Sequence, residues 1–95
     1  MRIADHTKQF RKDYKHLQKS GRYNLEKLHQ VLDLLIDGKQ LEKRYYDHPL
    51  RGEWQGCRDC HIESDLVLIY ELGINDNGLE VITFHRTGKH SNLFE

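Results

Sequence analysis

The 95-residue sequence predicts an α+β fold with the element order β-α-α-β-β-β, in which an N-terminal helical hairpin packs on a mainly antiparallel sheet. Two stretches within residues 5–38 carry apolar residues at helical spacing, and residues 54–84 carry runs that are typical of strands. Helices therefore come first and strands last, which favours α+β over α/β. A chain of this size buries only about 60–65% of its unfolded surface, so residues 1–95 are expected to form a single domain.

The chain is expected to begin with a short strand in residues 1–4, followed by the first helix. Phe10, Tyr14 and Leu17 recur at steps of four and three, which is the spacing of one helical face. Gly21 is the expected end of this helix, because glycine readily adopts the left-handed conformation that closes a helix.

A second helix is expected to begin at Asn24, whose side chain is a good N-cap, and to end at Gly38. Because only a few residues separate the two helices, they are expected to form an antiparallel hairpin. The wide apolar stripe of the second helix consists of Leu25, Leu28, Val31, Leu32, Leu35 and Ile36.

Residues 39–53 show little periodicity and contain the only proline of the chain, Pro49. An irregular stretch of this length in a small domain is often functional. Strand character begins after it. Residues 57–63 are the first candidate strand, and residues 66–70, a continuous apolar run, are the expected centre of the sheet.

The end of the chain predicts one more hairpin. Residues 75–78, Asn-Asp-Asn-Gly, are a turn signal, and residues 79–84 alternate as the returning strand. Residues 86–90 then predict a loop, and Leu93 and Phe94 are expected to pack the tail onto the sheet. The aromatic residues interpreted as parts of the core are Trp54, Tyr70 and Phe84.

The charges balance over the chain, with 15 Lys plus Arg and 15 Asp plus Glu. Taken alone, this net charge of zero argues against a strongly basic nucleic-acid binder. However, residues 1–44 hold 11 basic and 6 acidic residues, a net of +5, whereas residues 45–95 hold 4 and 9, a net of −5. The split predicts either two working surfaces or a solvated helical face beside a polar sheet.

Several classes of protein are excluded by simple patterns. No run of about 18 apolar residues is present, so no membrane span is expected. Residues 1–7 lack the apolar run of a signal peptide. The two cysteines lie three positions apart and make a poor disulfide framework. A cytoplasmic, reducing location is therefore expected.

Residues 57–61, Cys-Arg-Asp-Cys-His, match the pattern of c-type haem attachment. The only methionine is Met1, so the usual methionine axial ligand has no candidate. No second paired ligand motif follows, which argues against zinc. In a strand, Cys57 and Cys60 point to opposite faces. They are interpreted as small strand residues, and neither a metal nor a cofactor is expected.

The histidines are a stronger chemical signal. His48, His61 and His90 lie beside expected loops or turns, and imidazole can give or take a proton near neutral pH. Cleavage of RNA without metal needs a base for the 2′-OH, an acid for the 5′-oxygen and a cation for the charge on phosphorus. Neighbouring aspartates and arginines complete that set. The alternative is that these histidines are scattered over a polar surface.

Lys8, Lys12, Lys15 and Lys19 follow one another at steps of four, three and four, so they share a face of the first helix. Such a stripe either contacts phosphates or is merely solvated. The sequence pattern leaves both interpretations open.

Five segments together resemble the YafQ group of RelE-type toxins, the toxin halves of bacterial type II toxin–antitoxin pairs. The resemblance covers nearly the whole chain and implies a RelE-like β-α-α-β-β-β fold. It also implies a ribosome-dependent endoribonuclease that cleaves translated mRNA by metal-independent attack of the 2′-OH on the adjacent phosphate. The segments are residues 46–50 (YDHPL), 52–54 (GEW), 58–61 (RDCH), 65–70 (DLVLIY) and 86–94 (RTGKHSNLF).

The resemblance maps the catalytic set of this family onto His48, His61, Asp65 and His90. His90 is assigned as the general acid, because it ends the R-T-G-x-H motif. His48 or His61 is the base, and Asp65 orients or tunes one of them. Asp59 is a further candidate.

The resemblance also places Arg86 near the phosphate and Phe94 near the base, and it favours the phosphate-contacting interpretation of Lys8, Lys12 and Lys15. It implies the ribosome and mRNA as partners, together with a cognate antitoxin in a heterotetramer or a larger assembly. Operator DNA is expected to be bound only through the antitoxin. The alternative function is a non-catalytic antitoxin-binding module that acts as a transcriptional corepressor.

Overall fold

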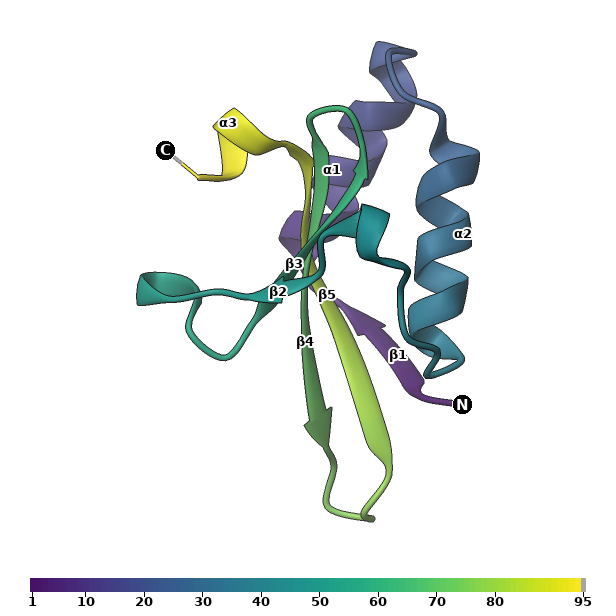
Figure 1. Ribbon diagram of the computed structural model, residues 1–95, viewed down its shortest axis with the longest axis vertical. Coiled ribbons are helices and arrows are strands. Elements are labelled where there is room, and N and C mark those ends of the chain that lie inside the picture. Colours follow the sequence, from purple (N-terminus) through teal and green to yellow (C-terminus); the bar gives the residue numbers. More distant parts are fainter. Residues whose placement is uncertain (95) are drawn as a thin grey trace.

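In the computed structural model, which describes residues 1–94, a five-stranded sheet carries two helices on one face (Figure 1). The strand order is β1-β5-β4-β3-β2, and the expected α+β class with an N-terminal helical hairpin is confirmed. The strands are β1 Ile3–His6, β2 His48–Pro49, β3 Arg58–Glu63, β4 Leu66–Ile74 and β5 Glu80–Lys89. The helices are α1 Lys8–Ser20, α2 Leu25–Ile36 and α3 His90–Leu93, with short 3₁₀ turns at Lys43–Tyr45 (η1) and Gly52–Trp54 (η2).

Capping residues define the ends of the two helices in the hairpin. The Thr7 side chain accepts a hydrogen bond from the Phe10 amide and begins α1. Gly21, at φ +62°, ends α1 in the left-handed conformation. The Asn24 side chain accepts from the Glu26 amide at 3.0 Å and begins α2. The two expected caps at Gly21 and Asn24 are therefore confirmed.

The sheet is antiparallel except at one edge, where β1 runs parallel to β5. Strand β5 is consequently flanked by β1 and by β4, although it comes last of the five strands in the sequence of residues 1–94. Ile69 pairs with Arg86 and Tyr70 pairs with Phe84, so His85 is an extra residue in β5. This β-bulge bends the strand and changes the direction of its side chains.

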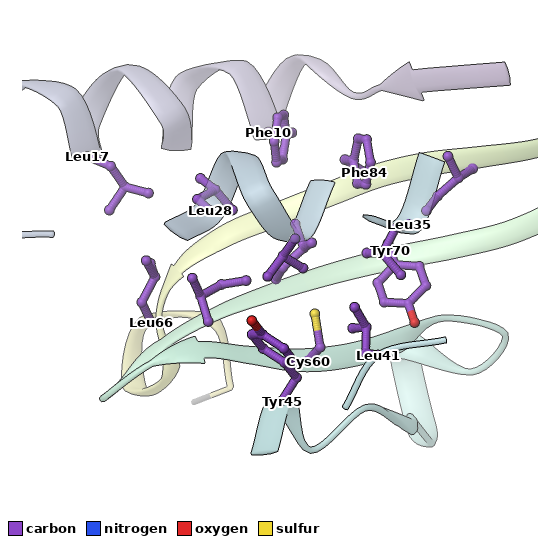
Figure 2. Close-up of a cluster of buried hydrophobic side chains, with 14 residues drawn as sticks. Phe10, Leu17, Leu28, Leu35, Leu41, Tyr45, Cys60, Leu66, Tyr70 and Phe84 are labelled. Atoms are coloured by element: carbon purple, nitrogen blue, oxygen red, sulfur yellow. The ribbon is translucent and has the colours of Figure 1, made fainter. Parts of the chain in front are cut away.

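The two faces of the sheet bury different clusters. The larger cluster lies between the helices and the sheet and contains Leu28, Cys60 and Tyr70 (Figure 2). A smaller cluster contains Cys57, Val67, Ile69 and Leu93, with Leu50, Trp54 and Phe94 packed against it. The two cysteines thus belong to opposite faces, as strand alternation predicts. Both are free thiols.

The expectation that residues 86–90 form a loop is wrong. Strand β5 continues to Lys89, because Arg86 to Lys89 pair with the apolar run of β4 from Ile69 back to Leu66. The Thr87 hydroxyl also donates to the Val67 carbonyl at 2.9 Å. Long-range pairing therefore overrides the polar, glycine-containing sequence. Within residues 1–94, α1 is the longest helix at 13 residues, and none has the length and apolarity needed to span a bilayer.

Candidate active site

Three histidines from separate segments meet near one end of the sheet. His48 lies on β2, His61 on β3, and His90 at the start of α3 directly after β5. The ring centroids of His48 and His61 are 6.4 Å apart, and those of His61 and His90 are 5.9 Å apart. Side chains at this separation can contact opposite sides of one phosphodiester, as general acid–base catalysis requires.

The strand register explains why the histidines converge. His48 is paired with Asp59 across β2 and β3, and His61 lies two positions further along β3 on the same face. His90 is fixed by its backbone amide, which donates to the Asp65 carbonyl at 2.8 Å in the turn between β3 and β4. The expected grouping of His48, His61 and His90 is thus a product of the sheet.

Asp59 lies beneath these imidazoles and is 1% exposed. Its Oδ2 is 3.8 Å from His48 Nε2, and its Oδ1 is buried without a hydrogen-bond partner among residues 1–94. Burial raises the pKa of Asp59, while the neighbouring charges of His61, His48 and His90 act in the opposite direction.

His48 is oriented by the backbone. Its Nδ1 lies 2.7 Å from the Tyr46 carbonyl, and a carbonyl oxygen can only accept, so Nδ1 carries the proton of the neutral ring. Nε2 is then the proton-accepting nitrogen. Tyr46 itself adopts φ 49°, and its exposed ring lies 5.0 Å from His48 and 5.5 Å from His61 between centroids.

Asp65 lies in the turn between β3 and β4, and both its side chain and its backbone form hydrogen bonds. Its carboxylate accepts a hydrogen bond from the Tyr23 hydroxyl at 2.8 Å, and this bond lowers the pKa of Asp65. The backbone carbonyl of Asp65, rather than its carboxylate, holds His90. The Asp65 side chain therefore connects the turn between α1 and α2 with the turn between β3 and β4, whose backbone bonds His90.

Arg86 is held by helix α1. Its Nε and Nη2 donate to the Asp13 carboxylate at 2.8 and 3.1 Å, and this bonding raises the pKa of Arg86. A pocket of about 150 Å³ is lined by Asp13, Arg86 and Lys89, among other residues. A guanidinium has five N–H donors, so donors remain for an anion in this pocket.

Phe94 lies beside the histidine cluster, with its ring centroid 4.8 Å from that of His90. It is half-buried and packs against the smaller core cluster. Its position serves both interpretations of the sequence, because a ring can pack the tail and still present an edge or face to a base.

The lysine stripe lies on α1, outside the elements that carry the histidine cluster. Lys8, Lys12 and Lys15 are all exposed. Lys15 lines a second, more open pocket of about 370 Å³ together with Arg11 and His29. The structure thus provides a basic helical surface separate from the histidines.

The histidine cluster also has donor atoms that could hold a cation. One ligand atom from each of Asp59, His61 and His90 lies within 4.8 Å of the other two. Imidazole and carboxylate are suitable ligands for a divalent transition metal. The same groups, without metal, provide the base and acid of a proton-transfer reaction.

Sequence reasoning assigned no role to Tyr46 or Asp13 and left Asp59 as a secondary candidate. The signal for Asp59 is its two-residue spacing from His61 on one strand. Tyr46 stands in the YDHPL segment, but its contact with two histidines depends on a positive φ. The pairing of Asp13 with Arg86 spans 73 positions and has no local signal.

Comparisons with known proteins point in one direction. The family described as "Bacterial toxin of type II toxin-antitoxin system, YafQ" matches residues 2–95. The mRNA interferase toxin YafQ of Escherichia coli K12 is 40% identical over 94 residues, which cover 98% of this chain and 96% of that protein.

Solved structures agree with the sequence matches. The crystal structure of YafQ from Escherichia coli BL21(DE3) superposes with a TM-score of 0.87 at 38% identity over the full length of both chains. The Escherichia coli DinJ-YafQ complex gives a TM-score of 0.84 at the same identity, again with both chains fully covered.

Proposed function

The chain belongs to the YafQ family of type II toxin–antitoxin toxins, and we propose that it is a ribosome-dependent endoribonuclease that cleaves translated mRNA. The observation that carries the proposal is the convergence of His48, His61 and His90 above buried Asp59. Related proteins are named mRNA interferases, and acid–base groups in this arrangement suit cleavage of a phosphodiester.

The proposed reaction needs no metal. His48 or His61 removes the proton of a ribose 2′-OH, and the resulting oxygen attacks the adjacent phosphorus. His90 protonates the departing 5′-oxygen, so the products are a 2′,3′-cyclic phosphate and a 5′-hydroxyl. The orientation of His48, with Nε2 as its proton acceptor, favours it as the base.

Asp59 and Asp65 act through the histidines. Asp59 lies 3.8 Å from His48 Nε2 and stabilises the imidazolium that forms when the base accepts its proton. Asp65 positions His90 through its backbone carbonyl, and its carboxylate is held by Tyr23. The role proposed for Asp65 is therefore to orient the general acid.

Arg86 and Phe94 bind the substrate in this proposal. The free donors of Arg86 stabilise the negative charge that develops on the phosphoryl oxygens. Its anchoring by Asp13 at 2.8 and 3.1 Å fixes the guanidinium before the RNA arrives, so little is lost in ordering it. Phe94, adjacent to His90, stacks on a nucleobase beside the cut.

The exposed lysines of α1 supply the affinity for the ribosome. Lys8, Lys12 and Lys15 form a surface that would contact rRNA phosphates, and such contacts weaken as salt increases. Ribosome dependence follows if the isolated protein cannot hold mRNA in the conformation required for in-line attack.

A cognate antitoxin is the proposed protein partner. YafQ of Escherichia coli has been crystallised in a complex with DinJ, and we propose an equivalent complex for this chain, as a heterotetramer or a larger assembly. Operator DNA would be bound through the antitoxin. A non-catalytic module would need the same docking surface but would not need three converging histidines.

The test is expression in bacteria with and without the antitoxin gene, followed by mapping of mRNA 5′ ends. We expect growth arrest and new cuts in translated mRNA, with losses of at least about 100-fold in cutting for His90→Ala and His61→Ala. His6→Ala, at an exposed histidine on β1, is the matched control. Harmless expression without new 5′ ends would favour the non-catalytic module.

A further inference from the structure

A second group of ligand-type side chains lies away from the histidine cluster. One ligand atom from each of Cys57, Glu71 and His85 lies within 4.8 Å of the other two. Cys57 immediately precedes β3, Glu71 lies on β4 and His85 lies on β5. None of the three takes part in the proposed cleavage reaction.

The sheet geometry explains why the three meet. Cys57 belongs to the smaller cluster with Val67 and Ile69, and Glu71 continues their alternation on β4, so it lies on the same face. His85 is the extra residue of the β-bulge in β5. A bulge re-aims a side chain relative to regular alternation, and here the His85 Nε2 lies 2.9 Å from Glu71 Oε1.

From this geometry we propose that Cys57, Glu71 and His85 bind a borderline divalent cation of the Zn²⁺ type, with a fourth position open to water. Thiolate sulfur, imidazole nitrogen and carboxylate oxygen are the ligand types that Zn²⁺ accepts. A site with three protein ligands and one solvent position is an established form for this metal. The site is chemically distinct from Asp59, His61 and His90, which offer no sulfur.

The distances between the three ligand atoms fit a tetrahedral zinc site after small side-chain movements. Two nitrogen or oxygen ligands of a tetrahedral zinc ion are about 3.3 Å apart, given bond lengths of about 2.0–2.1 Å. The distance of 2.9 Å between His85 Nε2 and Glu71 Oε1 would increase by a few tenths of an ångström. The Cys57 sulfur would move closer to both atoms. Glu71 has the freedom for this, because its side chain is 49% exposed.

The surroundings allow entry from solvent and protect the sulfur. The His85 side chain is 25% exposed, whereas Cys57 is buried. The Trp54 ring packs edge-on to His85 with centroids 6.2 Å apart, which restricts the imidazole. Burial and the Glu71 charge raise the pKa of the Cys57 thiol, and a cation between the two groups counters both effects.

The test uses the full-length purified protein with reduced thiols. It is titrated with Co²⁺, whose bond to a thiolate gives a near-ultraviolet charge-transfer band, and the bound Co²⁺ is then displaced with Zn²⁺. We expect one equivalent of Co²⁺ with the thiolate band in the wild type and loss of the band in Cys57→Ser. Cys60→Ser is the matched control, because Cys60 is buried on the opposite face, and it should retain the band.

Two further variants separate this site from alternatives. His85→Gln and Glu71→Gln change partly exposed side chains, so they test the site even if Cys57→Ser fails to fold. Each should weaken Co²⁺ binding, read from the thiolate band, at least tenfold. His61→Ala, which breaks the other donor cluster, should leave the thiolate band intact. A wild-type protein without the band, or a band that persists in Cys57→Ser, overturns the proposal. It is also overturned if both glutamine variants show the thiolate band at the same Co²⁺ concentrations as the wild type.

Discussion

The Asp13 carboxylate holds the Arg86 guanidinium by two hydrogen bonds, at 2.8 and 3.1 Å. The same carboxylate accepts a hydrogen bond from the Thr87 amide at 3.2 Å. Helix α1 and strand β5 are therefore joined by a charged contact, and the helix with the exposed lysines also fixes the arginine proposed to bind the scissile phosphate. Through this one aspartate, the helix proposed to bind rRNA is connected to the arginine proposed to bind the phosphate.

Replacing Asp13 with Asn should weaken this connection. The variant loses charge-assisted hydrogen bonds of a partly buried pair, so we expect the free energy of unfolding to fall by about 1–3 kcal/mol. RNA cutting should fall as well, because Arg86 is no longer held. Urea denaturation and cleavage in a translating extract measure the two effects. Asp5→Asn, at an exposed aspartate, is the control, and equal stability of the two variants would contradict the prediction.

Asp59→Asn should separate stability from activity. Burial raises the pKa of Asp59 above its usual 3.8, so the folded state is favoured while Asp59 is protonated and loses stability as the pH rises above that range. The amide removes this loss. We therefore expect the stability of the variant relative to the wild type to increase as the pH rises from about 4 to about 7. The cleavage rate of the variant should fall.

Urea denaturation of the wild type and Asp59→Asn at both pH values checks the first effect, and mapping of cut mRNA checks the second. Parallel pH dependence in the two proteins would show that Asp59 ionisation does not oppose folding. Full cleavage activity in the variant would remove Asp59 from the proposed tuning of His48.

Tyr23→Phe should raise the pKa of Asp65. The Tyr23 hydroxyl is the main cause of the lowered pKa of Asp65, and phenylalanine lacks that donor. A lowered carboxyl pKa stabilises the folded state above the unfolded pKa, and the contribution is lost as the pH falls through the folded pKa. The variant should therefore be less resistant to acid. NMR titration of the Asp65 carboxyl measures the change.

The control for this titration is Tyr14→Phe, whose hydroxyl bonds to His29 instead. It should leave the Asp65 pKa unaltered. An Asp65 titration that is identical in wild type and Tyr23→Phe would mean that the hydrogen bond at 2.8 Å does not persist in solution.

Charge reversal on α1 should weaken ribosome binding. In Lys12→Glu/Lys15→Glu, the exposed surface loses contacts with phosphates, and cosedimentation with ribosomes should fall most at low salt, where such contacts are strongest. The charge-matched control is Lys39→Glu/Lys43→Glu, at exposed lysines beyond α2. Similar loss in both variants would indicate a general charge effect rather than a docking surface on α1.

Much of the fold could be predicted because its signals are local. Asn24 and Gly21 mark the ends of helices through short-range capping. The run from Leu66 to Tyr70 is apolar at every position and forms the buried part of β4. Strand alternation alone correctly assigned Cys57 and Cys60 to opposite faces.

The parts that could not be predicted depend on contacts between distant residues. The strand at Arg86 to Lys89 exists because β4 supplies its partners, and its own sequence is that of a loop. The bulge at His85 is a mismatch between two strands, which neither strand reveals by itself. For the site, histidine chemistry indicated three segments that lie together in the fold, but the contact of Asp59 with His48 required the register of β2 on β3.

The position of β5 determines when the proposed active site can assemble. This strand pairs with both β1 and β4, and His90 and Phe94 follow it directly. Until β5 has been synthesised, the growing chain therefore lacks both its complete sheet and the third histidine of the proposed cluster, His90. Folding must wait for these distant pairings, which are slow to form. The proposed catalytic cluster is therefore among the last parts of the molecule to assemble.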